Sequence, residues 1–234
     1  MKTIQNCIHR LCLICSVGAL MLLIGCSKSD TYDENTLPYY SEASFTPNWF
    51  NSHSEVPAGF HKIPAFTLMD QEGQTITEAT FEGKLYVANF FFTSCPGICP
   101  MTMGNMARLQ EAFEYDKDVV LLSHSVTPEK DSVDALLAFA EKTKALSSKW
   151  YLATGTRDHI YDLGKNFYFA EEDLGLEEQV DLRGQAFLHT ESFFLIDHNR
   201  HIRGVYNGMN TASVTQLIAD IKHLKNEAES NQKA

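Results

Sequence analysis

The chain has 234 residues, 44% of them hydrophobic and 21% charged, which is the composition of a globular protein. Its 19 basic and 30 acidic residues give a formal net charge of −11. This acidic balance argues against a nucleic-acid-binding protein and against electrostatic adhesion to anionic lipid.

Residues 1–25 are predicted to be a signal peptide. A weakly basic start, with Lys2 and Arg10, precedes an apolar stretch from Leu11 to Ile24. That stretch is too short to span a bilayer comfortably, and it has the length of a signal-peptide core. It ends in Leu23-Ile24-Gly25-Cys26, which resembles the bacterial lipobox, in which the cysteine is lipidated and becomes the first residue. An uncleaved signal anchor is the alternative.

Processing before Cys26 leaves 209 of the 234 residues, enough for one well-buried domain and a tether. It removes two basic residues and no acid, so 17 basic against 30 acidic residues leave a charge of −13. The lipid is then the sole link to the membrane, and the protein is expected in the bacterial cell envelope on the extracytoplasmic side.

The six cysteines divide by position. Three leave with the signal peptide (Cys7, Cys12 and Cys15), and Cys26 carries the lipid. Two thiols, Cys95 and Cys99, stay in the mature protein. A zinc ribbon needs four thiolates or histidines at paired spacings, so this count excludes it.

Three segments follow the signal peptide. Residues 26–38 are polar and without apolar periodicity, as a lipidated tether should be. Residues 39–59 are rich in aromatic side chains, and we expect them to dock on the domain; an aromatic surface for a partner is the alternative. Residues 60–228 form the predicted domain.

Strands and helices alternate through that domain. The expected elements are a hairpin (66–69 and 74–77), a strand (85–92), a helix (100 to about 115), a strand (119–123), a helix capped by Asp131 with Val133, Leu136, Leu137 and Ala140 on its inner face, a strand (150–153), a short helix capped by Thr156, a hairpin (193–196 and 202–206) and a closing helix capped by Thr211. This order predicts an α/β fold, a thioredoxin-like α/β sandwich with an N-terminal β-hairpin extension.

The two thiols lie between the predicted strand 85–92 and the helix that begins at Pro100. If the turn is helical, residues four apart share a face, and their sulfurs can close a disulfide or hold one soft metal ion. We expect the helix N-terminus to lower the thiol pKa values. The alternative is that Cys95 and Cys99 are simply buried small side chains.

A metal site needs a third ligand, and nine histidines are available. His189 comes just before the strand 193–196, and in a thioredoxin fold the loop that enters this strand lies across from the cysteine corner. His124 follows a buried strand at its carboxyl end, where α/β sheets place ligands, and is an alternative candidate.

Residues 91–100 together with 189–197 resemble the Sco/SenC family of copper-binding assembly proteins, and the resemblance covers roughly residues 60–224. It implies that Cys95, Cys99 and His189 are the copper ligands. Residues 126–131 also look like the family's Val-Asp-Pro-Glu-Arg-Asp segment. Two departures are Thr127, where the family has an acid, and Leu188, where an acid often precedes the histidine.

Two thiolates and an imidazole suit copper, because Cu(I) prefers sulfur and Cu(II) outranks other first-row divalent ions on nitrogen and sulfur ligands. Three methionines of the helix can add thioether donors, although methionines at this spacing more often belong to a core: Met101, Met103 and Met106. The acidic run 171–173 is expected to be a solvated loop, with a basic patch on a partner as the alternative.

The sequence therefore predicts a lipid-anchored copper chaperone. By resemblance its client is the binuclear copper centre of cytochrome c oxidase subunit II. The alternative is a thiol–disulfide oxidoreductase that uses Cys95 and Cys99 as a redox pair, and either activity requires a thiol reductant. Thioredoxin-type reductases have a cis-proline where this chain has His189, which favours copper. A peroxidase fits less well, since no arginine lies near the cysteines before Arg108.

Overall fold

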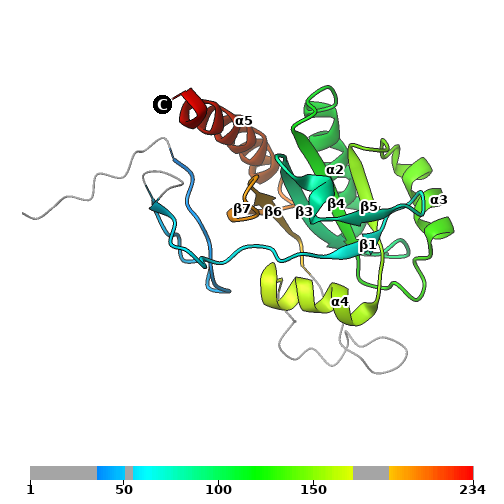
Figure 1. Cartoon of the computed structure of the whole chain (residues 1–234). Helices are drawn as coiled ribbons and strands as arrows, with labels where there is room; N and C mark the ends of the chain where they lie inside the picture. The colour runs from blue at the N-terminus through cyan, green and yellow to red at the C-terminus, as the bar shows by residue number, and fades with distance from the viewer. Residues whose placement is uncertain (1–35, 51–54, 171–189, 234) are drawn as a thin grey trace, which may run out of the picture. The chain divides into compact units, whose positions relative to one another are not determined.

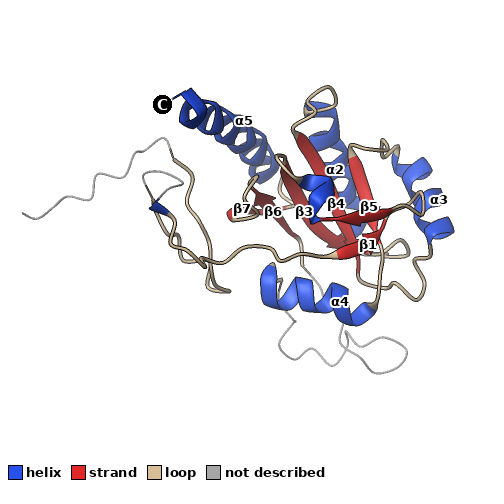
Figure 2. Ribbon diagram, viewed as in Figure 1, coloured by secondary structure: helices blue, strands red, loops and turns tan. Residues whose placement is uncertain are grey.

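A computed structural model of the chain describes residues 36–50, 55–170 and 190–233, all within one compact unit. Five strands form its main sheet in the order β5 (Trp150–Ala153), β4 (Val119–Ser125), β3 (Leu85–Phe91), β6 (Ser192–Ile196) and β7 (Ile202–Asn207). The first three are parallel, and β6 and β7 each run antiparallel to the preceding neighbour. Helices and strands are mixed as Figure 2 shows, which confirms the predicted α/β class.

The central strand β3 is buried along its whole length. Alternate residues point to opposite sides of a strand, so its apolar run supplies two separate cores. Val87 and Phe91 belong to one core, and Tyr86 and Phe90 belong to the other. A continuous apolar run is typical of a parallel strand covered on both faces.

Three helices cover the first face (Figure 1): α2 (Cys99–Ala112), α3 (Val133–Thr143) and α5 (Thr211–Lys233). Each contributes a buried apolar stripe at helical spacing, which removes that surface from water. The stripes consist of Met103, Met106 and Leu109; Leu136 and Ala140; and Val214, Leu217, Ile221 and Leu224. Both cysteines lie on this face.

The opposite face is covered by a small antiparallel hairpin and by α4 (Arg157–Asp162), which lies away from α2 and α5 in Figure 1. The hairpin consists of β1 (Thr67–Met69) and β2 (Thr75–Thr77), followed by the 3₁₀-helix η3 (Glu78–Phe81). The π-helix η4 (Leu163–Phe167) continues α4. Among the described residues, no helix combines the length and apolar character that crossing a bilayer requires.

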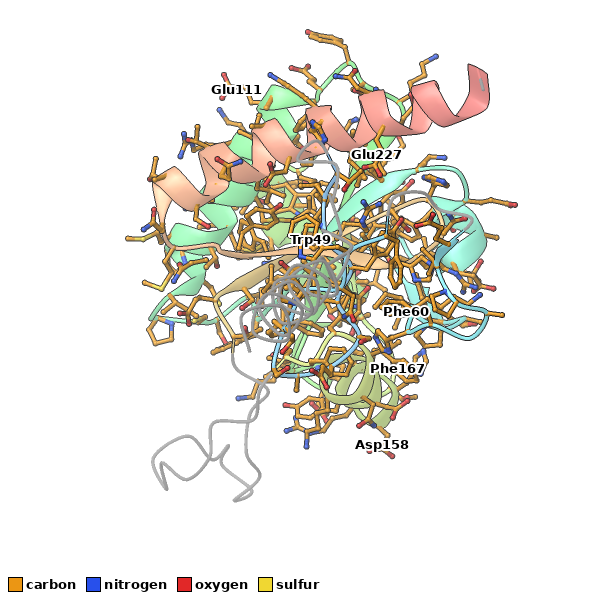
Figure 3. The ribbon with its side chains drawn as sticks, turned by 90° about the vertical axis from the view of Figure 1, so that its left-hand side faces the viewer. Trp49, Phe60, Glu111, Asp158, Phe167 and Glu227 are labelled. Atoms are coloured by element: carbon orange, nitrogen blue, oxygen red, sulfur yellow. The ribbon has the colours of Figure 1, made fainter. Side chains whose placement is uncertain are left out.

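The segment before β1 packs on the β7 side of the sheet. Tyr39 forms an antiparallel bridge with Asn48, and Tyr40 forms one with Ile202 of β7. The ring of Tyr39 meets the ring of Phe60 edge-on at 6.2 Å between centroids. Figure 3 looks onto this side of the molecule, with Phe60 and Trp49 labelled. The segment thus contributes aromatic rings to the packing.

Arg203 of β7 fixes the start of that segment. Its buried guanidinium donates to the backbone carbonyls of residues 37 and 38 at 2.7 and 3.1 Å. It also pairs with Asp197 at 3.4 Å and with Glu227 at 3.3 Å, and it lies 3.9 Å from the ring centroid of Tyr39. Burial raises the pKa of Tyr39, so the phenol stays neutral beside these charges.

Several details differ from the sequence prediction. The cap of α3 is Ser132, whose hydroxyl accepts from the Ala135 amide at 3.3 Å, and Asp131 does not cap the helix. The start of α5 is capped by the Asn210 side chain, and Thr211 is the first helical residue. Leu137 is 43% exposed and does not face the core, and the long helix α2 ends at Ala112. Thr156 caps α4 as predicted.

Candidate metal-binding site

The two cysteines lie where β3 turns into α2. Cys95 is in the connecting loop, with its amide donating to the Phe92 carbonyl at 3.3 Å, and Cys99 is the first residue of the helix. Pro100 follows in the first turn, where a missing N–H costs nothing. Both thiols are free, and both cysteines line the same groove. The local fold therefore juxtaposes two soft donors.

The environment of Cys99 is more apolar than the sequence suggested. The residue is 6% exposed, whereas Cys95 is half-buried. Burial, followed by the hydrogen bond with Cys95, raises the pKa of the Cys99 thiol. The expected lowering by the helix N-terminus is wrong for Cys99, because the desolvation of a buried thiolate outweighs the attraction of the helix dipole.

A groove of about 280 Å³ opens beside the pair, between α2 and α3. Its lining is mostly apolar and contains one charged side chain, Lys142. The remaining lining residues are Phe92, Thr93, Cys95, Cys99, Pro100, Met103, Gly104, Ala107, Phe139 and Thr143. Both cysteines line this groove, and Cys95 is the more accessible of the two.

The three methionines of α2 occupy different environments. Met101 is 53% exposed, and Met106 is fully buried in the core. Met103 is buried too, and it lines the groove beside the cysteines. Its sulfur lies 3.7 Å from the Asn89 amide nitrogen of β3. Met103 is therefore the thioether that the structure places next to both thiols.

A network of buried polar side chains connects the sheet to α2. The Ser123 hydroxyl donates to Asn89 Oδ1 at 2.6 Å and accepts from Trp150 Nε1 at 2.9 Å. These side chains come from β3, β4 and β5, and all are buried. Satisfied polar groups inside a core help to specify one packing arrangement. The network holds Asn89, and through it Met103, in a defined position.

His124 is separated from the cysteines by the sheet. Its ring stacks on Phe90 at 5.0 Å between centroids and lies 5.4 Å from the ring of Tyr168. Both rings belong to the core under α4, whereas Cys95 and Cys99 pack on the other core. The structure therefore removes His124 as an alternative third ligand.

Several of the predicted features lie outside the described residues: the signal peptide (1–25), the lipidation site Cys26, the tether up to residue 35, the acidic run 171–173, Leu188 and the histidine His189. Within the described part, no group of three or more His, Cys, Asp or Glu side chains is arranged to hold a metal ion.

Thr127 and Asp131 take part in a hydrogen-bond network that the sequence did not reveal. The Thr127 hydroxyl donates to Asp131 at 3.0 Å, and the buried Asp131 carboxylate also accepts from Thr93, two residues before Cys95. At position 127, where the resembled family has an acid, this chain thus has a hydroxyl that donates to the carboxylate of Asp131. Asp131 itself was visible in the sequence, where it was predicted to cap the helix that follows.

Comparison with known proteins shows that most of the chain is similar to one protein family. Residues 55–226 match the SCO1/SenC family. The SCO1 protein homolog of Bacillus subtilis is 28% identical over 165 residues, which are 69% of this chain and 82% of the homolog. A SCO1/SenC family lipoprotein from Bacillus anthracis has a solved structure with 31% identity and a TM-score of 0.61, covering 70% of this chain and 95% of the lipoprotein.

Two further solved structures are similar. BsSco, described as a member of the Sco family of cytochrome c oxidase assembly proteins with a disulfide switch, is 26% identical with a TM-score of 0.60, over 71% of this chain and 94% of BsSco. Copper-bound ScoI of Arabidopsis thaliana has a TM-score of 0.54 over 70% of this chain and 98% of ScoI, and its 22% identity supports the fold alone.

Proposed function

This chain belongs to the SCO1/SenC family, and on that premise we propose that it is a copper chaperone for cytochrome c oxidase assembly. Copper is its cargo, bound through the thiolates of Cys95 and Cys99 and the imidazole of His189. The proposed client is the binuclear copper centre of subunit II. The observation that carries the proposal is the placement of two free thiols on one groove at the start of α2.

The donor set fits copper. Thiolates are the ligands that Cu(I) prefers, and imidazole suits both oxidation states. Copper binding displaces the thiol protons, so the raised pKa of the Cys99 thiol makes copper uptake more favourable as the pH rises. Since Cys95 is half-buried and borders the groove, a client thiol can approach from that side and take the ion by ligand exchange.

The sheet register supports His189 as the third ligand. Strand β6 is antiparallel to β3, with Phe194 opposite Ala88, so β6 begins at the edge where β3 ends. The chain therefore enters β6 at Ser192 on the same edge from which β3 leads to Cys95. His189 precedes Ser192 by three positions.

A thiol–disulfide oxidoreductase is the second candidate, because the two thiols are free and line one groove. Such a pair can form a disulfide, which a thiol reductant can reverse. The raised pKa of the Cys99 thiol disfavours it as the attacking thiolate. Cys95 is the more exposed of the pair and would be the attacking group.

We also propose that a lipid on Cys26 anchors the mature protein on the extracytoplasmic side of a bacterial membrane. The lipobox-like sequence before Cys26 supports this, as does the similarity to a family lipoprotein. With a net charge of −13 after processing, computed from 17 basic and 30 acidic residues, no nucleic-acid partner is proposed.

His189→Ala separates the two candidate functions. A copper chaperone loses one of three ligands, so the variant should bind copper weakly and fail to load the client. A redox pair needs no imidazole, so Cys95 and Cys99 should still cycle with a small reductant. His198→Ala, in the turn after β6, is the matched histidine control. If His189→Ala bound copper like the wild type and lost only disulfide exchange, the oxidoreductase would be the correct function.

A further inference from the structure

A buried carboxylate lies behind the cysteine loop. Asp131 follows the loop after β4, and none of its surface is exposed. Within residues 36–50, 55–170 and 190–233, no cation forms an ion pair with it. Burying a carboxylate without a counter-charge is costly unless hydrogen-bond donors replace the lost water. The hydrogen-bond donors around Asp131 must therefore offset the cost of burying its carboxylate.

Four hydrogen bonds reach this carboxylate. The Thr93 hydroxyl donates to Oδ1 at 2.6 Å, and the Thr93 amide donates to Oδ2 at 3.3 Å. The hydroxyls of Ser125 and Thr127 donate to Oδ2 at 2.5 and 3.0 Å. An ionised carboxylate only accepts, so it satisfies all four donors at once. If asparagine replaced Asp131, its amide NH₂ group would face some of these donors and could not accept hydrogen bonds from them.

The network joins two segments that are far apart in the sequence. Ser125 ends β4 and Thr127 follows it, whereas Thr93 follows β3 and is two residues before Cys95. Because β3 and β4 are parallel neighbours, both of their carboxyl ends meet Asp131. Both the amide and the hydroxyl of Thr93 are bound, so its backbone and its side chain are held.

The other end of the cysteine loop is less constrained. The residue before α2, Ile98, provides no side-chain cap for the helix. A Cβ atom added at Gly97 would meet nothing within 4 Å, so open space surrounds that part of the loop. The contact of Thr93 with Asp131 is thus well placed to set where Cys95 lies relative to Cys99.

We propose that Asp131 is a positioning residue for the cysteine pair and acts through Thr93. This rests on the proposed copper-binding function. Asp131 does not touch the ion; it holds the loop so that the two sulfurs are already arranged for one copper ion. Groups that orient metal ligands in this way typically change metal affinity about 10- to 100-fold when they are removed.

Thr93→Val tests the proposal, because it keeps the side-chain shape and removes the hydroxyl that donates to Asp131. Thr127→Val is the matched control: it removes a hydroxyl bound to the same carboxylate, but outside the cysteine loop. Thr93→Ser retains the hydroxyl and should rescue. We expect Thr93→Val to lose about 10- to 100-fold in copper affinity. Thr127→Val and Thr93→Ser should stay close to the wild type.

A second readout separates positioning from general stability. The melting temperature of the copper-free protein should fall equally in Thr93→Val and Thr127→Val, since each loses one hydrogen bond to the same group. The dithiol–disulfide equilibrium in a glutathione buffer should shift toward the dithiol in Thr93→Val and not in Thr127→Val. Asp131→Asn should show both effects, and a failure of that variant to fold leaves the two threonine variants as the test.

The outcomes are distinct. If Thr93→Val bound copper like the wild type, the positioning role would be wrong while the copper function stood. Equal copper losses in both valine variants would also contradict it, because the effect would then follow stability. If the wild type bound no copper through its cysteines, the proposed function itself would fail.

Discussion

The imidazole of His124 stacks on the ring of Phe90, at 5.0 Å between centroids and 22° between planes. The two residues are direct partners in the parallel pairing of β3 and β4. Both ring nitrogens of His124 are buried and have no hydrogen-bond partner within the described residues. A titratable group is thus placed in an aromatic core, on the face of the sheet opposite the cysteines.

We predict that His124 makes the protein less stable in mild acid. Burial, followed by the nearby His159, lowers the pKa of His124 to about 3. The unfolded chain protonates His124 below a pH of about 6.5, and the folded chain does not. The free energy of unfolding should therefore fall as the pH drops from about 6.5 toward 3, by up to about 1.4 kcal/mol per pH unit.

Urea unfolding of His124→Leu at several pH values measures this contribution. The variant should lose that part of the pH dependence, and its stability near neutral pH should not fall, because a buried group without a partner is removed. His198→Ala retains His124 and should keep the wild-type pH profile. An unchanged profile in His124→Leu would show that other groups cause the acid sensitivity.

A second prediction concerns Arg203. Arg203→Leu leaves Asp197 buried without its cation and removes the donors to the carbonyls of residues 37 and 38. Breaking a buried pair in this way costs about 3–5 kcal/mol. Limited proteolysis should also cut the variant faster within residues 36–50.

Arg157→Leu is the matched control for Arg203. Arg157 pairs with Glu129 at 3.7 Å, and the Glu129 side chain is 40% exposed. Arg157 also lies 4.2 Å from the ring centroid of Tyr161. Breaking this pair leaves the Glu129 carboxylate in contact with water, and a partly exposed ion pair and a cation–π contact each contribute about 1 kcal/mol or less, so this variant should lose clearly less stability than Arg203→Leu and should not be cut faster within residues 36–50. Equal losses in the two arginine variants would mean that Arg203 has no special part in holding the N-terminal segment.

The third prediction concerns the anchor. Cys26→Ser removes the proposed lipid attachment, so the protein should be released from membranes or accumulate as an unprocessed precursor. Fractionation of cells grown with radiolabelled fatty acid measures both outcomes. Label on the Cys26→Ser protein would show that the lipid is attached elsewhere.

Much of the fold could be predicted because its signals are local. The apolar run of β3 and the helical spacing of Val214, Leu217 and Ile221 depend on neighbours in the sequence, and these elements are confirmed. The choice of cap was harder, because Asp131 and Ser132 are adjacent and both residue types cap helices.

The errors at the site arise from contacts between distant segments. The pKa of the Cys99 thiol depends on burial against α3 and the sheet, which the Pro-Gly break around it did not indicate. The role of Asp131 depends on Thr93, which reaches it because β3 and β4 are neighbours. Alternate residues of β4 point to opposite faces of the sheet, and this alternation decides the face on which His124 lies. Because β4 is buried on both faces, its sequence does not show which residues point to which face.

The central claim is that Cys95 and Cys99 together bind one copper ion. The most direct test is the melting temperature of the reduced soluble domain, with and without copper, for the wild type, Cys95→Ser and Cys99→Ser. A ligand that binds only the folded state adds about 4 kcal/mol at a thousandfold excess over its dissociation constant. The account predicts one copper per wild-type chain, with a strong rise in melting temperature that is nearly absent in both variants. An equal rise in all three proteins would contradict it, because copper would then bind elsewhere.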